Sequence, residues 1–145
     1  MIFINVIMVR IQTIEDLNNI TKNDIELIFD DNFNENIIIP NFIRILTFGK
    51  KFNQKIIIPD TVQTLKFGHN FNRKVIIPKS VEKLTFGYYF DKKIIIPKSV
   101  KTLTFGHEFD QKVIIPDSVQ ILKFGWNINR KIIIPKSVRL RKYRI

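Results

Sequence analysis

Residues 75–93 read VIIPKSVEKLTFGYYFDKK, and near copies of this string follow one another along most of the 145-residue chain. Every proline and every glycine of the chain keeps a 19-residue spacing: Pro40, Pro59, Pro78, Pro97, Pro116 and Pro135; Gly49, Gly68, Gly87, Gly106 and Gly125. Self-similarity at a period near 20 residues is typical of a solenoid, in which each repeat forms one coil stacked on its neighbours.

Each repeat predicts two short strands. In Leu84-Thr85-Phe86 the two apolar side chains share one face, which is the period of a β-strand. The glycine that follows is expected to adopt a backbone conformation that other residues disfavour, and so to end the strand. The aliphatic triplet before each proline forms the second extended run. We therefore expect an all-β, right-handed solenoid of stacked 19-residue coils with two parallel sheets, about 4.8 Å between rungs.

The core of each coil should hold the leucine, both phenylalanines, the valine after the serine, and two of the three isoleucines. The sequence leaves open whether the middle isoleucine is buried; these residues are Ile38, Ile57, Ile76, Ile95, Ile114 and Ile133. If exposed, they form an apolar stripe long enough for self-association. A homo-oligomer would then form through Ile57, Ile76, Ile95 and Ile114.

Both ends of the array depart from the repeat. We expect an N-terminal cap over residues 1–24, the solenoid over 25–138 and a basic C-terminal cap over 139–145. Residues 1–9 read as a strand, and 11–20 as either an imperfect coil or a short helix. Arg141 falls in the leucine column and Tyr143 in the phenylalanine column. The charged side chains of this last rung are expected to oppose edge-to-edge pairing with another molecule. No targeting or membrane-spanning segment is recognisable, and we expect an intracellular protein without a membrane partner.

The unit resembles the FNIP repeat, because Phe-Asn, Ile-Pro, Ser-Val and Leu-x-Phe-Gly occur in that order over about residues 25–143. That family is known from slime moulds and giant viruses of amoebae and is related to leucine-rich repeats. The resemblance implies a binding scaffold in the cytoplasm of a cell or of an infected host. These coils are shorter than usual between Phe-Asn and Ile-Pro. About 20 residues precede the first coil, too few for the F-box that many relatives carry.

Charge is divided unevenly along the chain, whose net charge is +11. Residues 1–36 hold two basic and seven acidic residues, whereas residues 37–145 hold 22 basic and six acidic ones, a net +16. Stacked coils would align cations into a stripe able to follow a nucleic acid or another polyanion: Lys55, Arg73, Lys74, Lys92, Lys93, Lys112, Arg130 and Lys131. The alternative is a solvated face that keeps an isoleucine-rich protein soluble.

The two positions after each glycine vary most and are rich in rings. Exposed aromatic side chains are common anchors of protein interfaces, so we predict a protein-binding surface at His69, Tyr88, Tyr89, His107 and Trp126. The alternative is that these rings shield the edge of the core from water.

The chain carries no recognisable reaction machinery. Cysteine is absent, and the two histidines lie two coils apart, about 10 Å by the rung spacing. The glycines stand alone and form no phosphate-binding loop. Ser80, Ser99, Ser118 and Ser137 occupy one turn column and are not nucleophiles. We therefore predict a non-enzymatic scaffold that recognises an unidentified protein partner and uses no cofactor and no metal.

Overall fold

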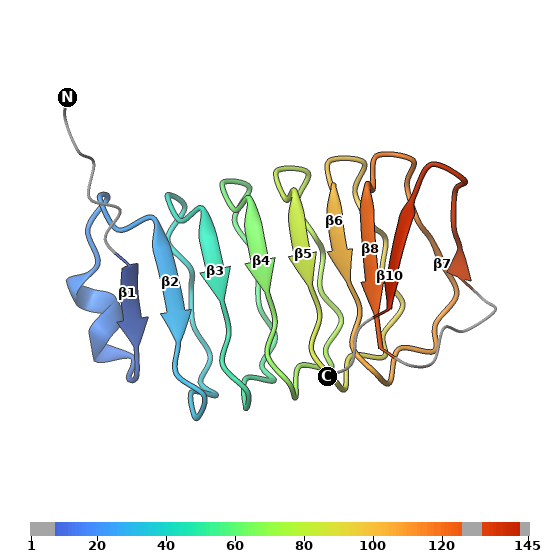
Figure 1. The fold of residues 1–145 in the computed structure, drawn as a ribbon. Coiled ribbons are helices and arrows are strands. Elements are labelled where there is room, and N and C mark those ends of the chain that lie inside the picture. The colour runs from blue at the N-terminus through green and yellow to red at the C-terminus, as the bar shows by residue number, and fades with distance from the viewer. Residues whose placement is uncertain (1–7, 126–131, 143–145) are drawn as a thin grey trace.

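A computed structural model describes residues 8–125 and 132–142, and it shows a solenoid of stacked coils (Figure 1). One strand from each coil joins a parallel sheet of eight strands in the order β1-β2-β3-β4-β5-β6-β8-β10. These strands are β1 (Met8–Ile11), β2 (Glu26–Phe29), β3 (Ile45–Thr47), β4 (Thr64–Lys66), β5 (Lys83–Thr85), β6 (Thr102–Thr104), β8 (Ile121–Phe124) and β10 (Arg139–Lys142). The predicted all-β solenoid is confirmed, and the described residues contain no α-helix.

The leucine and phenylalanine columns form the core, as predicted. Leu65, Leu84 and Leu103 are fully buried, and the phenylalanine rings stack from coil to coil. Phe86 lies 5.6 Å from Phe67 by ring centroids and is nearly parallel to it, while Phe90 packs on Phe86 at 3.9 Å. Each coil therefore adds two rings to a continuous double stack, which holds neighbouring coils in register.

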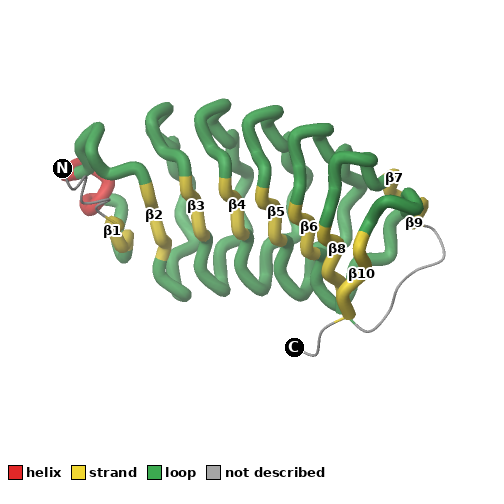
Figure 2. The backbone as a smooth tube through the Cα atoms, turned by 45° about the horizontal axis from the view of Figure 1, so that its top comes forward, coloured by secondary structure: helices red, strands yellow, loops and turns green. Residues whose placement is uncertain are grey.

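Coil spacing differs between the two ring columns. Centroids of the rings directly after the first strand are 5.4–5.6 Å apart between Phe48 and Phe105, whereas those four residues later are 6.0–6.2 Å apart between Phe52 and Phe109. Strands that pair in a ladder lie about 4.8 Å apart. Figure 2 shows strands in every coil along the first side of the solenoid and few on the second side.

The second sheet is short. Among the described residues it consists of β7 (Val113–Ile114) and β9 (Ile132–Ile133), which pair in parallel. In the earlier coils the triplet is not hydrogen-bonded as a strand, but its burial still alternates. Ile56 is half-buried, Ile57 is exposed and Ile58 is buried. Two of the three isoleucines thus face the core, as predicted, and the middle one does not.

The glycine column has a different cause from the one predicted. None of the described glycines has a positive φ, so the expectation of a conformation that other residues disfavour is wrong. The coils approach too closely for a side chain instead. A Cβ on Gly87 would overlap the carbonyl group of Gly68, and a Cβ on Gly106 would overlap that of Gly87. Glycine is required because backbone packs directly on backbone.

Within residues 11–20 the structure shows a short helix, one of the two predicted alternatives, whereas residues 1–7 of the strand expected over 1–9 lie outside the described residues. β1 extends the sheet, and the 3₁₀ helix η1 (Glu15–Asn19) follows it. In the next turn the backbone N–H and hydroxyl of Thr21 donate to the Asp24 carboxylate at 2.8 and 2.9 Å. Asp24 is buried in the column that holds isoleucine at position 43 and valine in the later coils, so this bonded carboxylate closes the first turn without proline.

At the C-terminal end the register differs from the prediction. Leu140, and not Arg141, pairs with Leu122 of the preceding strand, while Arg141 pairs with Lys123. The last coil is therefore one residue shorter than the repeat, and the expected placement of Arg141 in the leucine column is wrong. Tyr143 lies outside the described residues.

Candidate functional site

A ladder of asparagine and aspartate side chains ties consecutive coils together. The backbone N–H of Asn72 donates to Asn53 Oδ1 at 3.0 Å, and Asn72 Oδ1 in turn accepts from the N–H of Asp91 at 3.0 Å. The same bond joins Asn34 to Asn53 and Asp91 to Asp110. We did not predict this role. The signal was present, because the column after the second phenylalanine holds only Asn or Asp in every repeat.

The hydroxyl column makes a second set of coil-to-coil bonds. Ser80 Oγ donates to the carbonyl oxygen of Val62 at 2.8 Å, and Ser99 Oγ donates to that of Val81 at 2.8 Å. Ser118 repeats the bond one coil later, as Thr61 does one coil earlier. These hydroxyls are engaged with backbone, which agrees with a structural role for this column.

The predicted aromatic residues come together on one surface, which we name the aromatic column: His69, Tyr88, Tyr89 and His107. Tyr88 stacks between the two histidines, with centroid distances of 5.0 Å to His69 and 5.2 Å to His107. Tyr89 stands edge-on to His69 and Tyr88, and 48% of its surface is exposed. Trp126, the fifth predicted member, lies outside the described residues.

The surroundings of Tyr88 favour its neutral phenol over the phenolate, chiefly because the ring is partly buried. Partial burial, together with the nearby Glu108 carboxylate, raises the pKa of Tyr88 above its ordinary 10.0. The Nδ1 of His69 lies 3.0 Å from Asn70 Oδ1, so neighbouring polar groups orient this ring. The column therefore offers stacked rings with the neutral hydroxyl of Tyr88 among them, which suits apolar contact combined with hydrogen bonding.

The predicted cationic residues are aligned but not equivalent. Lys55, Lys74, Lys93 and Lys112 are exposed in four consecutive coils and make no ion pair among the described residues. Arg73, in the adjacent column, donates from Nε to the carbonyl oxygen of Asn53 at 2.9 Å. Lys92 is half-buried beside this row, and Arg130 and Lys131 lie outside the described residues.

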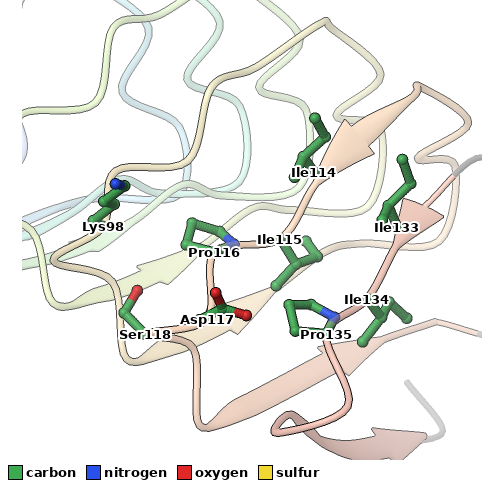
Figure 3. Close-up of a pocket in the computed structure, with 9 residues that line it drawn as sticks. All are labelled: Lys98, Ile114, Ile115, Pro116, Asp117, Ser118, Ile133, Ile134 and Pro135. Carbon is green, nitrogen blue, oxygen red and sulfur yellow. The ribbon is translucent and has the colours of Figure 1, made fainter.

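The middle isoleucines, which we name the isoleucine stripe, are exposed. Ile38 is 90% exposed, Ile57, Ile76 and Ile95 are each 88% exposed, and Ile114 and Ile133 are 66% and 52% exposed. In Figure 3, Ile114 and Ile133 project side by side from β7 and β9, while Ile115 and Ile134 point elsewhere. The adjoining hollow of about 560 Å³ is lined mainly by isoleucine and proline, with Lys98, Asp117 and Ser118.

The described part of the chain holds no group of three or more His, Asp or Glu side chains placed to bind a metal ion. Within the same residues, no helix is long and apolar enough to cross a membrane. The Glu108 carboxylate lies 3.8 Å from His107 Nδ1.

Comparison with known proteins agrees with this architecture. The FNIP repeat model matches residues 33–70, 52–89, 71–108 and 109–139. The chain belongs to the FNIP repeat family. The structure is also similar to the crystal structure of CroV588, described as a novel circular LRR protein, with a TM-score of 0.67 and 33% sequence identity. That match covers 80% of this FNIP repeat chain and 20% of CroV588, so the chain spans about a fifth of its length. No curated protein sequence matches the chain significantly.

Proposed function

We propose that this FNIP repeat chain is a non-enzymatic scaffold that recognises a protein partner through the aromatic column. The observation that carries the proposal is the continuous ring stack of His69, Tyr88 and His107, with Tyr89 presented edge-on beside it. The rings stack without a gap on the surface, so a partner meets one pre-organised patch. Rigid rings lose little conformational entropy on binding, which is why such residues dominate interface energetics.

The position of the column supports recognition. Leucine and phenylalanine recur in every coil because each coil must pack on the next. The position after each glycine, in contrast, changes from Lys50 to His69, Tyr88 and His107. A surface that varies while its support repeats can differ in chemistry along the array. The repeat architecture supplies the rigid backbone that such a surface needs.

Site-specific photocrosslinking tests this proposal. A photoreactive phenylalanine analogue replaces Tyr89, which is exposed, and a matched control places the same analogue at Lys79 on another part of the coil. We expect one protein adduct from position 89 and not from position 79. The variant H69A/Y88A should abolish that adduct. Its midpoint of urea unfolding should stay close to that of the wild type. Equal adducts at both positions, or an adduct that survives H69A/Y88A, would contradict the proposal.

The exposed lysine row favours a second candidate, electrostatic binding of a polyanion. Four cations in consecutive coils can follow a line of phosphates, and such binding weakens steeply as salt rises. Fluorescence anisotropy with labelled single-stranded and duplex oligonucleotides, measured against salt concentration, tests it. Replacing Lys55, Lys74 and Lys93 by glutamine should make oligonucleotide binding less dependent on salt. An unchanged slope of affinity against salt concentration would show that these lysines do not bind the polyanion.

A further inference from the structure

The isoleucine stripe is too large to be an incidental feature of the surface. The six side chains together expose on the order of 800 Å² of apolar surface, more than the few hundred Å² that a monomeric protein ordinarily leaves in one patch. That area is about what each partner contributes to a stable interface. We therefore expect a ligand to cover the isoleucine stripe.

Cations accompany the stripe along its length. Lys55 stands two residues before Ile57, and both are exposed, whereas Ile56 and Ile58 turn towards the core. The alternation of an extended segment places residues two apart on the same side. The same pair recurs as Lys74 with Ile76, Lys93 with Ile95 and Lys112 with Ile114. The face thus presents a column of aliphatic side chains beside a column of ammonium groups.

This face repeats itself, unlike the aromatic column. The same two residue types occur in each of four consecutive coils, so no position on this face differs from the others in a way that a protein partner could recognise. A uniform face suits a uniform ligand. A second copy of the chain is uniform, but pairing two stripes brings together two regions that each hold 22 basic and six acidic residues. Nucleic acid would match the lysines and leave the isoleucines in water.

We infer that this face docks on the surface of an anionic lipid bilayer. The isoleucines enter the boundary between headgroups and acyl chains, while the lysines extend to the lipid phosphates and carboxylates. We expected no membrane partner because the sequence lacks a spanning segment, and this contact needs none. The inference is independent of the aromatic column, which belongs to a different part of each coil.

Vesicle flotation with purified full-length protein tests the inference. The probes are vesicles of phosphatidylcholine alone and of phosphatidylcholine with phosphatidylserine, at low and at physiological salt. We expect binding to the anionic vesicles only, weakening as salt rises. Each lysine near an anionic surface strengthens partitioning about fivefold, so K55Q/K74Q/K93Q should weaken it by roughly a hundredfold. The control K51Q/K66Q/K83Q removes the same charge elsewhere and should retain most of the binding.

The isoleucine variant separates lipid insertion from charge attraction. I57N/I76N/I95N changes side chains that are each 88% exposed, so its unfolding midpoint should match that of the wild type. We expect it to lose binding to anionic vesicles by at least about a hundredfold, since each methylene withdrawn from the bilayer costs several-fold. A Y89A variant should bind vesicles as the wild type does.

Four results would overturn the inference. The first is no binding to phosphatidylserine vesicles at low salt. The second is unchanged vesicle binding by I57N/I76N/I95N, which would show that charge attraction without isoleucine insertion accounts for the binding. The third is tight oligonucleotide binding together with an absence of vesicle binding, which would assign the lysines to nucleic acid. The fourth is a mass that rises with concentration and falls in I57N/I76N/I95N without vesicle binding, which would make the stripe a seam between copies.

Discussion

Replacing Gly87 by alanine adds one methyl group at a point where two coils meet backbone to backbone. That methyl group would overlap the carbonyl group of Gly68 and lie 2.9 Å from the Cα of His69. A flexible side chain could rotate away, but a carbonyl held in a stack of coils cannot. The two coils must therefore move apart around residue 87.

The cost follows from what lies beside this contact. Moving the coils apart by about 1 Å forfeits up to half of the dispersion energy of the facing atoms. It also stretches the hydrogen bonds from Phe67 N–H to Thr85 O at 2.9 Å and from Tyr89 N–H to His69 O at 3.0 Å. Each bond contributes about 1 kcal/mol. With overpacking strain of about 1–3 kcal/mol, the free energy of unfolding should fall by about 3–5 kcal/mol.

Urea unfolding followed by circular dichroism measures this loss, and G125A is the matched control. A Cβ at Gly125 would meet His107, with the Cα at 2.9 Å and two side-chain atoms at 3.2 and 3.4 Å, and no carbonyl is among these nearest atoms. We expect a clearly smaller loss for G125A than for G87A. Alanine also restricts the unfolded chain, which by itself raises stability by about 0.4–1 kcal/mol. A G87A midpoint equal to or above that of the wild type would refute the explanation by close approach.

Three further changes test the bonds between coils. N72A should lower the free energy of unfolding by about 1–2 kcal/mol because the N–H of Asp91 loses its acceptor, whereas N72D keeps an acceptor oxygen and should unfold near the wild-type midpoint. S99A should cost about 1 kcal/mol in the same urea assay, because it removes a hydroxyl that donates to the preceding coil; a loss below measurement error would contradict that role. The hydrogen bonds and charge of Lys50 hold the pKa of Asp31 below 3.8, so its contribution to stability is present above that pH and fades as pH falls through the lowered pKa. The melting temperature should therefore drop less between pH 6 and pH 2 in D31N than in the wild type, and equal drops would remove Asp31 from the acid response.

The period of the sequence predicts the fold because every coil meets the same neighbours. A residue such as Leu84 has Leu65 on one side and Leu103 on the other, so its burial follows from the strand period alone. The adjacency of His69, Tyr88 and His107 follows in the same way, from one residue per coil. Stacking order is thus readable from a sequence with an unbroken repeat.

Three features depend on geometry that the period does not contain. The sequence does not show why residue 87 must be glycine, because the close approach depends on the path of the backbone in the preceding coil. The exposure of Ile57 depends on how the triplet bends around the core, and two alternatives fitted the pattern equally well. The pairing of Leu140 with Leu122 depends on a coil one residue shorter, which the 19-residue spacing of the prolines does not reveal.

Within the described residues, the hydrogen bonds of the asparagine ladder and of the hydroxyl column run in one direction, from each coil to the coil before it. Asn72 donates its N–H to the coil before it, as do the hydroxyl of Ser99 and the guanidinium of Arg73. Some backbone hydrogen bonds of the sheet run the other way, as from Phe67 N–H to Thr85 O, so an inner coil makes hydrogen bonds to both of its neighbours. In the part of the chain that the structure describes, Asn72 Oδ1 is satisfied only by the N–H of Asp91 in the next coil. A cut between two coils would therefore leave two chemically different surfaces: one exposes side-chain oxygens without donors, such as Asn72 Oδ1, and the other exposes N–H groups without acceptors, such as that of Asp91.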